Sequence, residues 1–167
     1  VIKDTRDLMD SELPIFVGLA VLLALVAMMV TLESTVLPFI FLASIGFAVI
    51  YNFGSNIFLG EISYITKAIA AVLQLGVTMD YSVFLMDRYE EECKHNDDRT
   101  MAMASAISST FVSLAGSSLT TVFGFLALCF MSFTLGLDLG IVMAKGVIIG
   151  VICCVTILPA LVLFFDK

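Results

Sequence analysis

The sequence has no tryptophan, one histidine and three prolines, and only 14% of its 167 residues are charged. Hydrophobic residues make up 60%, and the mean hydropathy is +1.10. A water-soluble domain could not cover so much apolar surface with so few polar side chains. Basic residues are also scarce, 8 against 15 acidic ones, which excludes the positive face needed to bind nucleic acid. The expected partner is therefore a lipid bilayer.

Signatures of catalysis and of bound groups are missing as well. The sequence contains no glycine-rich phosphate loop and no pair of residues that predicts a nucleophile with its base, so we expect no enzyme. The four cysteines form no C-x-x-C pair, and three of them lie in apolar runs. We therefore expect reduced thiols, no metal and no cofactor, with Cys93 as the thiol most exposed to reagents.

Long uncharged runs fill most of the chain instead. About 20 apolar residues are needed for a helix to cross the hydrocarbon core. The runs are continuous rather than alternating, which favours helices over barrel strands. The expected spans are residues 13–32, 36–53, 64–87, 102–131 and 139–165, with Pro159 kinking or ending the last. The sequence thus predicts an all-α, polytopic transmembrane helix bundle with five membrane-spanning helices, in the cell membrane.

The segments between the spans give an orientation. Residues 1–12 read as an extracytoplasmic linker that precedes a five-helix domain at residues 13–167, and residues 52–63 read as a loop. Residues 88–99 carry Arg88, Lys94 and Arg99. Loops rich in Lys and Arg stay in the cytoplasm, so residues 88–99 are predicted to be cytoplasmic, by a small margin.

Asp80 is the most informative residue in a predicted span. It precedes Arg88 by eight residues, which corresponds to about 12 Å along a helix. A charged Asp near the middle of a membrane helix costs roughly 2.5–3.5 kcal/mol. Without a partner or water it binds a proton, so its charge depends on its surroundings, as a proton-coupled transporter requires. Tyr81 can hydrogen-bond beside it; the alternative is a structural Asp that bonds to a neighbouring helix.

Residues 76–92, GVTMDYSVFLMDRYEEE, closely resemble the G-x-x-x-D-Y-x-x-F-L-x-x-R-x-x-E-E signature of the MMPL-type transporters, a branch of the resistance-nodulation-division superfamily. The matching positions include Gly76, Asp80, Tyr81, Phe84, Leu85, Arg88 and Glu91. The end of the last span, TILPAL at residues 156–161, is similar to the closing motif of that family.

The resemblance implies helices two to six of one half-repeat, without the first helix, the large extracytoplasmic domains and a second half. It implies export of hydrophobic or lipid-like substrates driven by the proton-motive force, with Asp80 and Tyr81 as half of an intramembrane proton relay. The same five-helix unit resembles the sterol-sensing domain, so the alternative is a lipid-binding regulatory module. Many members of the sterol-sensing group have two acids where this chain has the pair Asp80 and Tyr81, so the pair favours the MMPL branch. A purely structural membrane scaffold is a third interpretation.

Small and polar residues recur at a spacing of four in the fourth span. The stripe consists of Ser105, Ser109, Ser113, Ser117 and Thr121, and the fifth span adds the pair Gly146 and Gly150. Small residues let helices approach closely, and hydroxyls bond across the interface, so helix packing is the main interpretation. The alternative is a water-lined proton path beside Asp80.

Two lysines also lie within predicted spans, Lys67 and Lys145. Both are predicted to lie near the outer surface, where a long aliphatic stem lets the ammonium reach the interface. A role in the relay or in a substrate path is the alternative.

Overall fold

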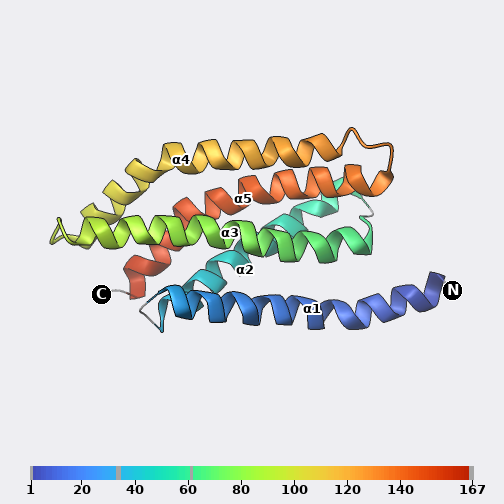
Figure 1. Cartoon of the computed structure of the whole chain (residues 1–167), viewed down its shortest axis with the longest axis horizontal. Coiled ribbons are helices and arrows are strands. Elements are labelled where there is room, and N and C mark those ends of the chain that lie inside the picture. The colour runs from blue at the N-terminus through green and yellow to red at the C-terminus, as the bar shows by residue number, and fades with distance from the viewer. Residues whose placement is uncertain (1, 33–34, 61, 166–167) are drawn as a thin grey trace.

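The computed structural model describes residues 2–32, 35–60 and 62–165, and Figure 1 shows them as an elongated bundle of long helices. The helices are α1 (Ile2–Thr31), α2 (Leu37–Ser55), α3 (Tyr64–Cys93), α4 (Arg99–Leu128) and α5 (Thr134–Phe165), and a short 3-10 helix η1 (Asn56–Leu59) follows α2. All five long helices are long and apolar enough to cross a membrane. The described residues contain no strand, and the predicted all-α bundle with five spans is confirmed.

Four of the five helices are longer than the spans predicted for them, and α4 has its predicted length but begins three residues earlier. Helix α3 continues past Asp87 to Cys93, and Arg88 pairs within it with Glu91 at 2.5 Å and with Glu92 at 3.4 Å. Pairs at these spacings stabilise a helix outside the apolar run. Helix α4 begins at Arg99 because the side chain of Asp98 caps it, accepting the Thr100 backbone N–H at 2.9 Å.

The first and last helices also differ from their predicted bounds. Helix α1 begins at Ile2, so the described part of the expected linker is helical, although the apolar span starts only at Ser11. Helix α5 begins at Thr134 and continues past Pro159 to Phe165, so this proline does not end the helix.

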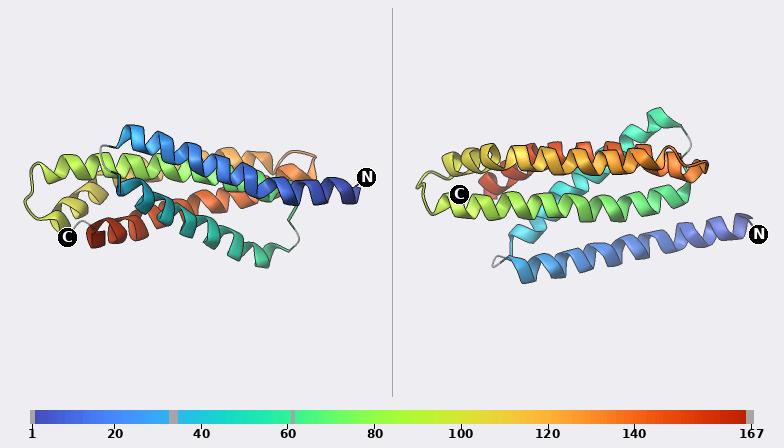
Figure 2. Two further views of the ribbon diagram at one scale, coloured as in Figure 1. Left: turned by 90° about the horizontal axis from the view of Figure 1, so that it is seen from below. Right: turned by 45° about the horizontal axis from the view of Figure 1, so that its top comes forward.

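Helix α5 occupies the middle of the bundle and packs against α2, α3 and α4, while α1 packs against α2 and α3 on the other side. Figures 1 and 2 show α2 crossing its neighbours obliquely. The bundle has two ends. We call the one that holds residues 88–99 the loop end. The opposite end, which holds the connections from α2 to α3 and from α4 to α5, is the far end.

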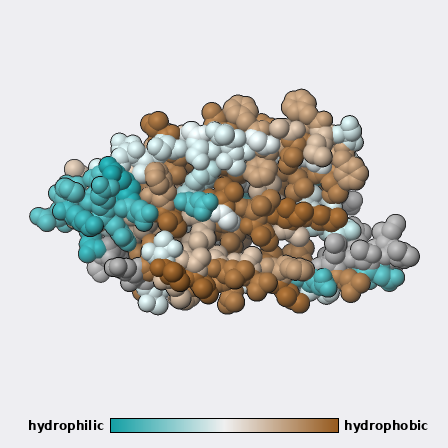
Figure 3. Space-filling view, in the orientation of Figure 1, coloured by the Kyte–Doolittle hydropathy of each residue, from teal (hydrophilic) through white to brown (hydrophobic). Residues whose placement is uncertain are grey.

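The interior combines apolar and polar contacts. Met28, Phe41, Leu85, Met143 and Leu158 are almost fully buried and come from four of the helices. Figure 3 shows that most of the lateral surface is hydrophobic, whereas hydrophilic side chains gather at the loop end. In a bilayer, an apolar side chain contacts lipid tails as favourably as it contacts another helix. Close packing and internal hydrogen bonds therefore hold the helices together.

Candidate functional site

Helix α3 presents a different chemistry on each of its faces. Because an α-helix turns once every 3.6 residues, residues two apart point to nearly opposite sides. Thr78 and Ser82 are buried at 1% and 0% exposure, while Asp80, between them, is exposed. Tyr81 follows Asp80 and is buried at 7% exposure. The signature residues Asp80 and Tyr81 therefore lie at the edge between the bundle interior and its surface.

Asp80 and Tyr81 open onto a groove between α3 and α4. The groove has a volume of about 380 Å³. Its α3 wall includes Phe84, and its α4 wall is lined by the hydroxyl residues Ser113, Ser117 and Thr121. Helix α4 thus brings three members of its serine and threonine stripe opposite Asp80. We call this the Asp80 groove.

The polar groups of this groove are largely free of protein partners. Within the described residues, the Asp80 carboxylate makes no hydrogen bond and no ion pair, and the hydroxyls of Ser113 and Ser117 donate none. Thr121 donates to the backbone oxygen of Ser117 at 3.0 Å. A carboxylate and hydroxyls without internal partners can bind water or groups from another protein surface.

The remaining two members of the stripe tie α4 to the loop end of α3. Ser105 donates to the Glu92 carboxylate at 2.9 Å, and Arg88 donates through Nε to Ser109 at 3.1 Å. Arg88 also pairs with Glu91 and Glu92. One helix face therefore has two uses, a polar clamp at the loop end and a hydroxyl wall beside Asp80.

A second groove of about 330 Å³ continues along the same seam towards the loop end. It is lined by Asp87, Arg88, Glu91, Ser109 and Thr110, together with Phe84. Phe84 lines both grooves and is 48% exposed, so it lies where the two grooves meet.

The other signature residues have packing positions. Leu85 is buried at 1% exposure in the main apolar core, on the face of α3 turned to its neighbours. Gly76 is exposed, and a Cβ built there would meet no atom within 4 Å. The structure therefore gives Leu85 a role in the core and shows no close contact that requires glycine at position 76.

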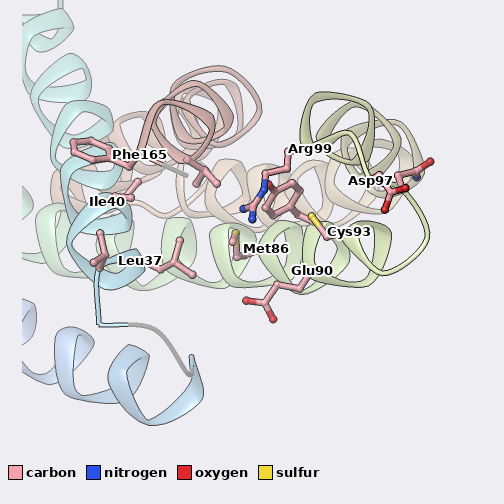
Figure 4. Close-up of a pocket in the computed structure, with 12 residues that line it drawn as sticks. Leu37, Ile40, Met86, Glu90, Cys93, Asp97, Arg99 and Phe165 are labelled. Atoms are coloured by element: carbon pink, nitrogen blue, oxygen red, sulfur yellow. The ribbon is translucent and has the colours of Figure 1, made fainter. Parts of the chain in front are cut away.

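The loop end holds a further cavity of about 600 Å³, shown in Figure 4. Among its labelled side chains, Leu37 and Ile40 come from α2, Phe165 comes from α5, and Met86 and Glu90 come from α3. This cavity shares no residue with the Asp80 groove. The charged residues of this cavity lie among the other charged residues of the loop end. The cavity therefore has no isolated acid comparable to Asp80 in the Asp80 groove.

A buried polar cluster between α2, α3 and α5 was not predicted. Asn52 donates to the Gln74 side chain at 2.7 Å and to the Val142 backbone oxygen at 3.4 Å. Gln74 in turn donates to the backbone oxygens of Ala48 at 3.2 Å and Gly146 at 3.3 Å. Both side chains are fully buried. The signal that could have revealed the cluster is the appearance of Asn and Gln inside otherwise apolar runs.

The glycine pair of α5 makes room for this cluster. A Cβ at position 146 would lie 2.6 Å from Asn52 Nδ2, and one at position 150 would lie 2.7 Å from Thr78 Oγ1. Glycine at both positions therefore allows polar side chains of α2 and α3 to reach the α5 backbone.

Lys145 makes contacts with α2 that the sequence did not indicate. Its ammonium donates to the backbone oxygen of Asn52 at 3.2 Å and to the Asn56 side chain. Since a helix C-terminus carries exposed carbonyls and partial negative charge, Lys145 caps α2 at the far end. Lys67 is exposed and makes no ion pair within the described residues, so it stays available at the surface.

The described residues offer no metal-binding cluster beside the Asp80 groove. No group of three or more His, Cys, Asp or Glu among the described residues could hold a metal ion. In the Asp80 groove an unpaired acid faces a row of hydroxyls.

Comparison with known proteins agrees with the motif and the fold. The model of the MMPL family matches residues 1–166. ActII-3 of Streptomyces coelicolor is 33% identical over 72% of the chain. The siderophore exporter MmpL5 of Mycobacterium tuberculosis is 24% identical over 97% of it, and the mycolic acid-containing lipids exporter MmpL11 of Mycolicibacterium smegmatis is 21% identical over all of it.

The chain spans 17% of ActII-3, 17% of MmpL5 and 19% of MmpL11. Its five apolar helices correspond to a membrane protein, and its similarity to named exporters indicates a transporter-type membrane segment. Since the family model covers residues 1–166 of the 167, the chain belongs to the MMPL family.

Proposed function

We propose that this chain is the membrane part of one half of an exporter driven by the proton-motive force, in which Asp80 binds and releases the proton. The observation that carries the proposal is an unpaired carboxylate in a hydroxyl-lined groove, within a helix long and apolar enough to span the membrane. A charge at such a depth costs roughly 2.5–3.5 kcal/mol unless it is supported, and taking up a proton removes that cost. A side chain that gains and loses charge in this way can couple a proton gradient to a change of shape.

Tyr81 and the α4 hydroxyls have supporting roles in the proposal. Tyr81 lines the same groove, next to Asp80 in the sequence, and its hydroxyl can donate to the charged carboxylate. Ser113 and Ser117 offer hydroxyls to water in the groove, and the second groove extends the polar seam towards the loop end. The proton would reach Asp80 through water held between α3 and α4.

The open side of the groove implies a covering partner. Asp80 and Ser117 are exposed on the lateral surface of the bundle, where lipid would surround them. A carboxylate facing lipid is unfavourable, so the remainder of a longer protein, with a second half-repeat, would cover it. The relatives support this partner, since the chain spans no more than 19% of the three compared above.

The substrate class follows from relatives and is part of the proposal. MmpL11 is named as an exporter of mycolic acid-containing lipids. We therefore expect a hydrophobic or lipid-like substrate, moved by transport and not changed by catalysis. The alternative, a lipid-binding regulatory module, predicts no substrate flux in response to a pH gradient.

The decisive experiment uses the complete transporter and measures substrate efflux under an imposed pH gradient. Asp80→Asn keeps the size and hydrogen bonding of the side chain but removes its titration, so efflux should stop while the protein level on a blot stays normal. Asp138→Asn, a matched change near the start of α5 and outside the groove, should leave efflux intact. Efflux by Asp80→Asn at the wild-type rate would exclude the proton role.

Tyr81→Phe tests the supporting role in the same assay. The ring stays in its buried position, and only the hydroxyl is lost. Efflux should fall less than in Asp80→Asn, because the carboxylate can still titrate. A complete loss of efflux would show that Tyr81 carries the proton itself.

A further inference from the structure

An apolar groove lies at the far end of the bundle, on the side away from Asp80. It has a volume of about 610 Å³, within the range of roughly 300–1,000 Å³ that is usual for small-molecule sites. Three helices form its walls: α1 contributes Pro14 and Gly18, α2 contributes Phe53, and α3 contributes Lys67 and Ala71. The space-filling view in Figure 3 shows the surface hollowed between α1 and the helices beside it.

The groove exists because α1 leaves space beside the other helices. In the apolar part of α1 only 11% of the residues are buried, against 44% in α3. Gly18 faces the space directly, since a Cβ built there would meet no atom within 4 Å. Ala71 is also small, so beside Lys67 the α3 wall takes up little of the groove.

Lys67 gives this otherwise apolar groove one charge. It is the fourth residue of α3, so it lies about 5 Å along the axis from the far end of that helix. Its aliphatic stem can line the wall while the ammonium reaches towards the interface. Within the described residues it has no ion pair, and Glu12, the acid just before the groove residues of α1, does not pair with it.

We infer that this groove binds a phospholipid of the bilayer, with an acyl chain between α1 and α3 and the phosphate at the Lys67 ammonium. In a membrane, apolar space open to the side is filled by a lipid tail. The phosphate of that lipid lies at the interface, which is where the end of α3 places Lys67. Phosphate oxygens accept charge-assisted hydrogen bonds from an ammonium. The inference does not depend on proton-driven transport, because neither Asp80 nor α4 lines this groove.

The role of the Lys67 charge is tested by measuring how much lipid the purified protein retains. The purified protein is equilibrated with phosphatidylglycerol in mixed micelles, and the bound lipid is counted by native mass spectrometry. Lys67→Gln should weaken retention roughly tenfold, the scale of one charge-assisted hydrogen bond. Lys94→Gln, the matched change just after α3, should retain phosphatidylglycerol as the wild type does. Lys67→Arg should restore retention.

The groove itself is tested by filling it. Gly18→Phe should abolish retention both of phosphatidylglycerol and of diacylglycerol, a lipid of the same tails without phosphate. Gly124→Phe places the same side chain on the exposed surface of α4, where a Cβ also meets no atom within 4 Å, and should have no effect. Circular dichroism and size-exclusion chromatography confirm that both variants are folded.

Three results would overturn the inference. Equal retention by Gly18→Phe and the wild type would show that the lipid lies elsewhere or that another helix of the full protein takes this place. Equal loss in Lys67→Gln and Lys94→Gln would show that only the total charge matters. Retention of the transported substrate but not of phosphatidylglycerol would also contradict it, because the groove would then belong to the cargo.

Discussion

Two ionisable residues within the spans have opposite surroundings. Lys145 is half-buried and donates to the backbone of Asn52 and to the side chain of Asn56. Asp80 is exposed and has no partner within the described chain. A charge with fixed partners holds structure, whereas a charge without them can bind water or a group from outside the described chain. The comparison supports a structural role for Lys145 and a functional one for Asp80.

Replacing Lys145 with Met should lower stability. The change keeps an apolar stem but removes the ammonium, which leaves the buried Asn56 oxygen without its donor at a cost of about 1–3 kcal/mol. We expect a lower midpoint of thermal unfolding in detergent. Lys94→Met, outside the spans, serves as the control. An unchanged midpoint for Lys145→Met would mean that the contact with α2 contributes nothing.

At the scale of helices, the sequence predicts where each helix lies along the chain better than it predicts which helices pack together. Apolar runs predict the five spans because length and hydropathy are local properties. The spacing of Ser105, Ser109 and Ser113 predicts a common face of α4. Which helix that face meets depends on how the chain folds back, and the structure brings it to α3. The Asn52–Gln74 pair escaped prediction for the same reason, since its two halves are 22 residues apart.

The contact of α5 with α3 gives a test at this scale. Gly150→Leu would drive a large side chain into Thr78, whose Oγ1 lies 2.7 Å from the position of a Cβ. Such overpacking costs about 1–3 kcal/mol or more, so α3 and α5 should separate and thermal stability should fall. Gly116→Leu, on an exposed face of α4 where a Cβ meets no atom within 4 Å, should be tolerated. Equal stability of the two variants would contradict the close approach.

The hydroxyl face of α4 can be tested in the same way. Ser113→Leu replaces a wall of the Asp80 groove with an apolar side chain. We expect near-normal folding, because Ser113 is exposed and donates no hydrogen bond in the described structure, but slower proton-driven efflux in the complete transporter. Ser108→Leu, exposed on α4 outside both grooves, is the control. Efflux unaffected by Ser113→Leu would argue against a hydrated path along this face.

At the scale of the whole molecule, the two ends of the bundle differ in charge. The loop end carries Arg88, Lys94 and Arg99 together with the acids around them, and Figure 3 shows hydrophilic side chains concentrated there. At the far end, the turn that connects α4 to α5 contains no charged residue. Lys and Arg in short loops favour the cytoplasmic side. The asymmetry therefore predicts that α3 enters the membrane from outside and that the Asp80 groove continues, through the second groove, towards the cytoplasm.

Cysteine labelling tests this orientation in intact cells. Cys93 lies at the end of α3 and is partly exposed, so a membrane-impermeant thiol reagent can reach it only from the side that the loop end faces. With Cys129, Cys153 and Cys154 replaced by alanine, Cys93 should be labelled only after the cells are permeabilised. The matched control adds Ser132→Cys in the exposed turn between α4 and α5, in a chain that also lacks Cys93. That thiol should be labelled without permeabilisation, because one span, α4, separates it from Cys93 and places it at the far end, on the side predicted to face outwards. Labelling of Cys93 from outside would reverse the orientation, and the second groove would then connect Asp80 to the extracytoplasmic side.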